Sequence, residues 1–251
     1  MKTNSFIKNR KAFTLSEILL VLGIISVIGV MTIPPLIQNS QEKMTVAALK
    51  KVFSTLSSAY TLAVQENGTP ENWGLVVGSH PEGDAPIINM LKPYLNVSKD
   101  CSDGSTGCFP PGIMYKYLRS SDIILIDTYS VPKLKLSDGT LLFGFTQSTN
   151  CTGIEGTSLA LQNICGRYFV DINGYKNPNQ YGKDVFRFYL TKYGVIPYGS
   201  AQENGSSSFV NDCKNKDTTN GFGCAAWVIY NENMDYLHCS NLSWDGPTKC
   251  Q

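Results

Sequence analysis

A loop rich in Asp, Asn and Gly, DINGYKNPNQYGKD, holds the residues best suited to bind a metal ion. Asp171, Asn173 and Asp184, with backbone carbonyls, supply the oxygen ligands that a hard cation such as calcium prefers. The loop is not an EF-hand, because the acidic residue expected at the twelfth loop position is absent. Asx and glycine turns explain the same composition without a metal. We expect a structural turn, and calcium held by these three residues is the alternative.

The chain offers few candidate residues for acid–base or nucleophilic catalysis. The two histidines, His80 and His238, lie outside any nucleophile–base motif. The sequence contains no nucleophile elbow, no phosphate-binding glycine loop and no zinc-protease helix motif. We therefore expect a protein that is not an enzyme and needs no cofactor, the calcium alternative apart.

One acidic residue, Glu17, occupies an unusual place inside a long apolar run. The run extends from Phe13 to Ile37, and Glu17 is its only charged residue. A charge at the centre of a membrane-spanning helix costs about 2.5–3.5 kcal/mol on insertion scales, so its presence needs a reason. A carboxylate at this position can pair with a cation, or it can reach the headgroups without a partner.

The apolar run is long enough to cross a membrane. Roughly 25 residues at 1.5 Å each span a bilayer core of about 30 Å, and they exceed the apolar region of a secretory signal, about 7–15 residues. Four cations precede the run: Lys2, Lys8, Arg10 and Lys11. The positive-inside rule places this basic end in the cytoplasm and sends the C-terminal bulk of the chain across the membrane.

The overall charge gives no sign of nucleic-acid binding. Lys and Arg number 21 and Asp and Glu number 20, and residues 1–12 hold four of the cations and no acid. The rest of the chain is therefore net negative and carries no basic stripe, which excludes a typical nucleic-acid-binding protein.

The eight cysteines all lie on the expected exported side. An even number of cysteines in an extracytoplasmic chain is typical of disulfides. Zinc fits poorly, because the sequence has no CxxC motif and no finger-type Cys–His spacing. Eight cysteines allow about a hundred pairings, of which pairing between sequence neighbours is the simplest. The expected bonds are Cys101–Cys108, Cys151–Cys165, Cys213–Cys224 and Cys239–Cys250.

An amphipathic helix continues beyond the apolar run. Pro34-Pro35 is expected to interrupt the hydrogen-bond ladder and to kink or loosen the helix, and Asn67-Gly68 supplies its C-terminal stop. One helix of roughly 55 residues, about 80 Å long, is thus apolar all round over residues 13–37 and amphipathic over 38–68. Its expected buried stripe comprises Thr45, Leu49, Val52, Phe53, Leu56, Tyr60 and Ala63.

Residues 11–17, KAFTLSE, resemble the prepilin processing motif of type IV pilins and type II secretion pseudopilins. In that family a prepilin peptidase removes a short basic leader immediately before a Phe, whose new amine is then N-methylated. The resemblance implies a leader of residues 1–12, cleavage between Ala12 and Phe13, and methylation of Phe13. It covers residues 8–40 and, beyond them, only the overall plan of the chain.

Three positions in this region compare closely with the family. Pro34 falls where many type IV pilins have a helix-loosening proline. Ala12 stands where Gly is usual before the cleaved bond, a change between small residues that should at most slow cleavage. Ser16 stands where an aliphatic residue is commoner, which slightly weakens packing against lipid.

The resemblance also implies a role for Glu17 in assembly. Glu17 is the acidic residue that the family retains near the start of the mature chain. After cleavage, the amine of Phe13 can meet the carboxylate of Glu17 on a neighbouring copy in a staggered bundle of helices. Two charges that are each unfavourable in a low-dielectric core become tolerable when paired, and the pair fixes the register between copies. Glu17 reaching the cytoplasmic headgroups alone is the alternative.

The rest of the chain, residues 69–251, is expected to form one extracytoplasmic α+β domain. A four- or five-stranded antiparallel sheet packed on residues 42–66 would bury the helix stripe and one face of the sheet. A short helix is expected at Ala85–Leu95, and residues 224–237 fit helix and strand equally. The expected strands are DIILIDT (122–128), GRYFVDI (166–172), VFRFYLT (185–191) and a hairpin over 133–145 with a two-residue turn at Asp138-Gly139.

Taken together, these features predict an α+β, pilin-like fold and a structural rather than enzymatic protein. The resemblance implies a minor or tip-exposed subunit of a type IV pilus or of a type II secretion pseudopilus. Its implied partners are other pilin or pseudopilin subunits, the prepilin peptidase and the inner-membrane assembly platform. Its implied location is the bacterial inner membrane, as a single pass with the N-terminus cytoplasmic, and then a periplasmic or extracellular filament. The alternative is a membrane-anchored extracytoplasmic binding protein or enzyme.

Overall fold

The computed structural model describes residues 14–77, 87–110, 112–120, 123–124, 131–206, 208–214 and 221–251, with the backbone alone at 123–124. The chain divides into two compact units, with the division between Glu42 and Lys43. The first unit contains the N-terminal part of a long helix. The second contains the rest of that helix and an α+β fold with an antiparallel sheet.

Helix α1 runs from Leu15 to Asn67, 53 residues in all, which confirms the single long helix predicted from the sequence. Pro34-Pro35 lies inside the helix and does not end it, since each proline removes only one N–H donor from the ladder. The helix ends at the expected stop. Gly68 has a φ of 75°, and its N–H donates to the carbonyl of Val64 (2.9 Å).

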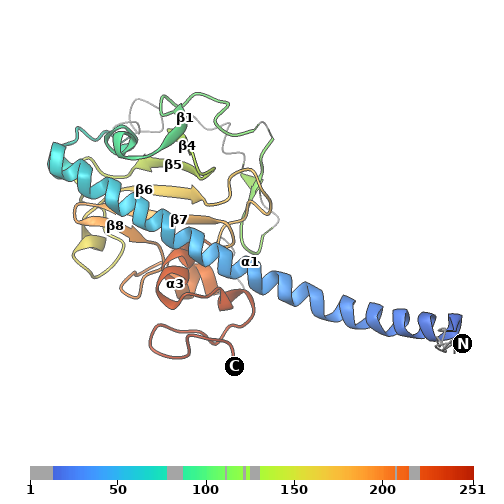
Figure 1. Cartoon of the computed structure of the whole chain (residues 1–251). Coiled ribbons are helices and arrows are strands. Elements are labelled where there is room, and N and C mark those ends of the chain that lie inside the picture. Colours follow the sequence, from blue (N-terminus) through green and yellow to red (C-terminus); the bar gives the residue numbers. More distant parts are fainter. Residues whose placement is uncertain are drawn as a thin grey trace, which may run out of the picture. The chain divides into compact units, whose positions relative to one another are not determined.

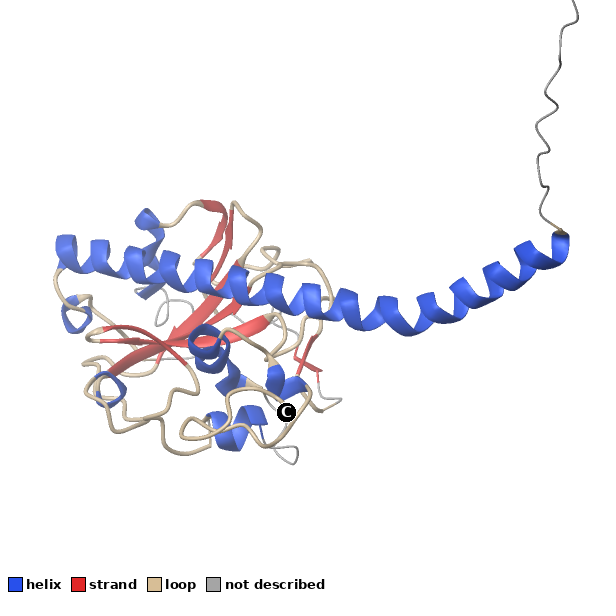
Figure 2. Ribbon diagram, turned by 60° about the horizontal axis from the view of Figure 1, so that its bottom comes forward, coloured by secondary structure: helices blue, strands red, loops and turns tan. Residues whose placement is uncertain are grey.

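The second half of α1 lies across one face of the sheet (Figures 1 and 2). Its buried stripe differs from the expected one at three points, one of which is the addition of Ala59. Val46 is buried in place of Thr45, and Phe53 is only partly buried, although its ring stacks on that of Phe188 with centroids 5.9 Å apart. The buried residues are Val46, Leu49, Val52, Leu56, Ala59, Tyr60 and Ala63.

Polar contacts also join this part of α1 to the sheet. The hydroxyl of Tyr60, at the buried side of the helix, donates to the backbone carbonyl of Lys192 (2.7 Å). Lys51 forms an ion pair with Asp138 (2.7 Å), in which 65% of the Lys51 side chain and 37% of the Asp138 side chain are exposed. An exposed pair of this kind is worth about 0–1 kcal/mol, so apolar burial is the main source of attachment.

The main sheet has six antiparallel strands in the order β1-β4-β5-β6-β7-β8. The four or five strands expected from the sequence were therefore too few. The missed strands are β1, whose side chains are mostly exposed, and β8, which is short and ends in proline, so neither carries a strong apolar alternation. The strands are β1 Val97–Cys101, β4 Lys133–Leu136, β5 Leu141–Thr146, β6 Ile164–Asp171, β7 Val185–Thr191 and β8 Gly194–Pro197.

A second, two-stranded sheet pairs β2 (Tyr115–Lys116) with β3 (Ile123–Ile124). These two isoleucines are the part of the expected strand 122–128 that the structure describes, and they pair with β2. The other residues of that expected strand lie outside the described residues.

The hairpin β4–β5 forms where the sequence predicted it, but its turn is longer than expected. The N–H of Leu136 donates to the carbonyl of Thr140 (2.8 Å), which leaves a three-residue loop in place of two. Only Gly139 has a positive φ, 94°, and a carboxylate oxygen of Asp138 accepts the N–H of Thr140 (3.1 Å). This local Asp hydrogen bond favours the longer loop, in which glycine alone adopts the left-handed conformation.

The remaining helices are short. The ambiguous stretch 224–237 contains two helices, α3 and η7, and residues 87–91 are helical and lead into η2. Ala85, where a helix was expected to begin, lies outside the described residues. The bounds are η1 Pro70–Asn72, η2 Lys92–Tyr94, η4 Ala160–Gln162, η5 Phe209–Lys214 (a π-helix), η6 Phe222–Cys224, α3 Ala225–Asn231 and η7 Asp235–Leu237.

Both faces of the sheet are buried, whereas the sequence predicted burial of one. Leu142 and Val170 are cross-strand partners in the core that contains α1. The next pair along the strands, Phe143 and Phe169, lies on the other face, with ring centroids 4.8 Å apart. Phe109 and Tyr115 belong to this second core, so the small sheet and the loop before it cover the face opposite α1.

Four disulfides close short loops around the sheet, and they join the cysteines in the sequence-neighbour pairs that we expected. Their partners are 7 to 14 residues apart, and none of the eight cysteines is free. The bonds are Cys101–Cys108, Cys151–Cys165, Cys213–Cys224 and Cys239–Cys250.

The packing of α1 on the sheet predicts a sharp contrast between two leucines of the same helix. Leu56 is 1% exposed and Leu62 is 45% exposed. Leu56→Ala should lower the free energy of unfolding by about 2–5 kcal/mol, because it leaves a cavity between helix and sheet. Leu62→Ala should change it by about 0.5 kcal/mol or less. Urea unfolding of the two variants in detergent measures both, and equal losses would contradict this arrangement.

Candidate functional site

The N-terminal part of α1 is the most unusual surface in the described chain. Residues 15–37 contain most of the large apolar side chains that the structure exposes, and Glu17 is the only charged residue among them. In the described residues, α1 is the one helix long and apolar enough to cross a membrane, and its most apolar window is not buried within the fold. These properties suit contact with lipid or with other apolar helices.

Two of the expected processing and assembly residues, Glu17 and Pro34, lie in this helix. Ala12 and Phe13 lie outside the described residues. Glu17 is in the first turn and Pro34 is in the helix interior. One carboxylate oxygen of Glu17, Oε2, accepts the backbone N–H of Thr14 (2.8 Å) and the Thr14 hydroxyl (2.8 Å). In return, the N–H of Glu17 donates to the Thr14 hydroxyl oxygen (3.3 Å).

The candidate cation residues come together at one end of the main sheet. Asp171 ends β6 and Asp184 immediately precedes β7, and both are buried. Between them, Asn173 donates its side-chain amide to Oδ2 of Asp184 (3.1 Å). The loop 171–184 therefore brings the three predicted residues into one cluster.

Protein donors engage all four carboxylate oxygens of this cluster. Oδ1 of Asp171 accepts the N–H groups of Asn173 (3.2 Å) and Gly174 (2.9 Å). Its Oδ2 accepts the hydroxyl of Tyr115 (2.9 Å), 56 residues away in the sequence. On Asp184, Oδ1 accepts the N–H of Gln180 (2.6 Å), and Oδ2 accepts that of Asn179 (2.8 Å) as well as the Asn173 amide.

Burial controls the electrostatics of the two aspartates. It raises the pKa of Asp171 to about 8, with a further increase from the nearby charge of Asp184, and hydrogen bonds from Tyr115 and the backbone oppose the shift. Burial raises the pKa of Asp184 as well. A neutral Asp171 next to a hydrogen-bonded Asp184 relieves the repulsion between two buried like charges.

The geometry accounts for this loop as a network of Asx turns. One group is not satisfied: the side-chain carbonyl oxygen of Asn173 is buried and has no hydrogen-bond partner. Within the described residues, no three His, Cys, Asp or Glu side chains come close enough to hold a metal ion. Protein donors already use the four carboxylate oxygens of Asp171 and Asp184, and calcium binding by Asp171, Asn173 and Asp184 stays a prediction.

A second buried acid, Glu203, had no signal in the sequence. Its Oε1 accepts the hydroxyl of Tyr189 (2.7 Å), and its Oε2 accepts the N–H of Gly199 (2.6 Å). Burial raises the pKa of Glu203 to about 8. Near it, Glu155 forms an ion pair with Arg167. The Glu203 side chain is enclosed, with 5% of its surface exposed, so it serves packing rather than contact with a substrate.

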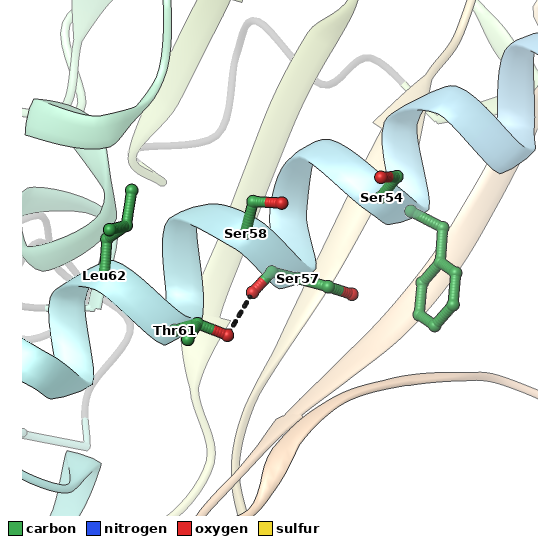
Figure 3. Close-up of a pocket in the computed structure, with 6 residues that line it drawn as sticks. Ser54, Ser57, Ser58, Thr61 and Leu62 are labelled. Atoms are coloured by element: carbon green, nitrogen blue, oxygen red, sulfur yellow. Dashed lines mark hydrogen bonds between the residues drawn. The ribbon is translucent and has the colours of Figure 1, made fainter.

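The exposed side of α1 carries a shallow open pocket (Figure 3). Four of its six lining residues are serine or threonine, but most of the lining surface is apolar. The hydroxyl of Thr61 donates to the backbone carbonyl of Ser57 (2.9 Å). No titratable side chain lines the pocket, so it offers no group for acid–base chemistry. Its lining is Phe53, Ser54, Ser57, Ser58, Thr61 and Leu62.

Comparison with known proteins gave no relative from which to transfer a function. No protein-family model matches the chain, and neither the curated proteins nor the solved structures gave a match. Functional inference therefore rests on the residues and the geometry described above.

The acidic cluster predicts different outcomes for two similar substitutions: Asp171→Asn should change the pH dependence of stability, and Asp184→Asn should lower stability itself. The folded state keeps the Asp171 proton up to about pH 8, whereas the unfolded chain releases it near pH 4. Between these values the folded state holds more protons, so the free energy of unfolding falls as the pH rises, by up to about 1.4 kcal/mol per pH unit. Asp171→Asn should remove that contribution, because an amide does not titrate in this range. The fold should accept the amide, because it can donate to the Tyr115 hydroxyl oxygen.

Asp184→Asn serves as the contrast. Both oxygens of Asp184 accept N–H donors. In Asp184→Asn the new NH2 group would therefore face another N–H donor, which should lower the free energy of unfolding by about 1–3 kcal/mol. Urea unfolding between pH 5 and 8 measures both variants. Glu203 contributes equally to the wild type and to Asp171→Asn, so the difference in slope isolates Asp171. An unchanged slope in Asp171→Asn would contradict the assigned protonation.

Proposed function

We propose that the chain is a structural subunit of a type IV pilus or a type II secretion pseudopilus, and that it polymerises through α1. The observation that carries the proposal is the difference in burial between the two parts of this one helix. Residues 15–37 are apolar and exposed, whereas the buried stripe between Val46 and Ala63 packs on the sheet. A helix of this kind joins a membrane segment to a folded domain and can pack with its own copies.

Three further features support this proposal. Residues 11–17 resemble the prepilin processing motif, and Glu17 remains in an otherwise uncharged segment. The four disulfides suit an oxidising compartment outside the cytoplasm. The two carboxyl groups whose pKa is raised to about 8, Asp171 and Glu203, are buried within the fold, so they suit stability better than catalysis.

The proposal also specifies where the protein is located and which partners it has. The chain enters the bacterial inner membrane with its N-terminus in the cytoplasm and then joins a periplasmic or extracellular filament. The prepilin peptidase, the assembly platform and other subunits are its partners. The large, disulfide-bonded domain suits a minor or tip-exposed position, where loops meet other molecules.

Processing of the N-terminus is the first test. The protein purified from its own cells should begin at N-methylated Phe13, which intact mass and N-terminal sequencing establish together. A chain that keeps residues 1–12 would instead be a single-pass anchored binding protein or enzyme. A chain cut beyond residue 37 would mean that the apolar segment is a signal sequence, which meets the same length and hydropathy criteria.

Glu17 is the second test. Glu17→Ala should insert in the membrane and be processed as the wild type is, but it should assemble poorly, because the Phe13 amine loses its counter-charge and the copies lose their register. The amount of protein in sheared filaments, relative to the total, measures this. Ser26→Ala is the matched control, since the Ser26 hydroxyl bonds to the carbonyl of Leu22 in its own helix (2.7 Å). Normal incorporation of Glu17→Ala would refute the role in register.

A further inference from the structure

Arg187 is a cation on the face of the main sheet opposite α1. It belongs to β7, and its cross-strand partner is Phe169 of β6 (Figure 1). Its guanidinium carbon, Cζ, lies 4.1 Å from the centroid of the Phe169 ring and 3.5 Å from that of Phe222. The ring of Tyr198 is a third aromatic neighbour, at 5.4 Å. Aromatic faces attract a cation, so these rings hold the guanidinium in place without neutralising its charge.

Among the residues that the structure describes, no acidic side chain forms an ion pair with Arg187. Its Nε is buried and has no hydrogen-bond partner. Its two Nη nitrogens have none among these residues either, but they are not enclosed, and Arg187 as a whole is partly exposed. The charge of Asp212 acts on Arg187 only from a distance, and Oδ2 of Asp212 accepts the N–H of Gly223 (2.9 Å). A partly buried cation without an anion at hand is costly to the fold.

A second arginine on the same face, Arg167, provides a contrast. It lies opposite Tyr189 in the β6–β7 ladder. Its Nε donates to the side-chain carbonyl of Gln147 (2.7 Å), and its Nη2 pairs with Glu155. Burial lowers the pKa of Arg187, and the positive charge of Arg167 acts in the same direction. Arg167 thus has its anion within the chain, whereas Arg187 has no such partner in the described residues.

The cover on this face of the sheet is incomplete near Arg187. Phe143 and Phe169 are buried, whereas Phe145 and Phe222 are each partly exposed. Phe145 contacts Phe169, with ring centroids 6.2 Å apart, so both partly exposed rings lie close to the guanidinium. This part of the surface therefore presents a cation flanked by apolar rings.

We propose that Arg187 binds the carboxylate of a ligand that has an apolar body, and that Phe145 and Phe222 contact this body. A guanidinium presents its N–H donors as a planar fork, which matches the two oxygens of a carboxylate. A phosphate fits less well, because its further charged oxygens would lie against aromatic rings that offer no donor. Binding here involves no residue of α1, so it can be tested whether or not the chain assembles into a filament.

The first measurement follows the arginine Nε–H signals by NMR in the ¹⁵N-labelled full-length chain in nonionic detergent micelles. The probe is benzoate, a carboxylate on an aromatic ring, and the comparisons are sodium phosphate and sodium chloride at the same ionic strength. The Arg187 signal should shift with benzoate and saturate with a dissociation constant of about 1 mM, and it should shift about tenfold less with either salt. The Arg119 signal should not move, because its guanidinium already donates to the carbonyls of Cys213 (3.0 Å) and Tyr236 (3.0 Å).

The second measurement uses two variants and the midpoint of thermal unfolding. Arg187→Lys keeps the charge but loses the planar fork, and should weaken benzoate binding by about tenfold. Lys135→Gln is the matched control, since it removes a cation of the same sheet that lies over the Tyr175 ring (4.4 Å). Benzoate should raise the midpoint of the wild type and of Lys135→Gln, and leave that of Arg187→Lys nearly unchanged.

Four results would contradict the proposal. An Arg187 signal that does not move with benzoate would overturn the site, and this readout needs no variant to fold. An equal shift with sodium chloride would mean general screening of charge and would overturn the site as well. An equal shift with phosphate would overturn the assignment of a carboxylate on an apolar body. Benzoate binding by Arg187→Lys as tight as that of the wild type would overturn the role of the guanidinium fork.

Discussion

Burial of one stripe of α1 against the sheet is the contact on which the domain depends. Leu49 and Leu56 have almost no exposed surface, and they belong to the same core as Leu142, Val170 and other sheet residues. Without the helix, that face of the sheet would be open to water. The same helix also carries the apolar segment, so the two properties that set this protein apart are built into one continuous element.

The opposite face of the sheet is covered differently. Loops, the small sheet and short helices provide aromatic side chains that contact Phe143 and Phe169 in edge-to-face or tilted arrangements. The guanidinium of Arg187 packs against Phe169 and Phe222. Loops of this kind lose much conformational entropy on folding. The four disulfides offset part of that loss, each by about 2–4 kcal/mol where its geometry permits. Buried acids such as Asp171 and Glu203 link neighbouring segments through hydrogen bonds.

In the proposed subunit, the two ends of α1 solve separate physical problems. The domain end relies on apolar burial, which tolerates some freedom in side-chain choice. The membrane end contains Glu17, whose carboxylate is hydrogen-bonded to Thr14, and such bonds matter there because lipid supplies no substitute. The disulfide-bonded loops outside the membrane can then vary in sequence without disturbing either end of α1.

The sequence alone determined the features that depend on neighbouring residues. Periodicity and the Asn67-Gly68 stop predicted α1, β-forming runs predicted β6 and β7, and short separations made the cysteine pairs easy to choose. Tertiary structure decided the rest, including β1, β8, the cover on the second face of the sheet and the contact of Tyr115 with Asp171 across 56 residues. Local patterns carry no record of such contacts, because they form only when distant segments meet in the folded chain.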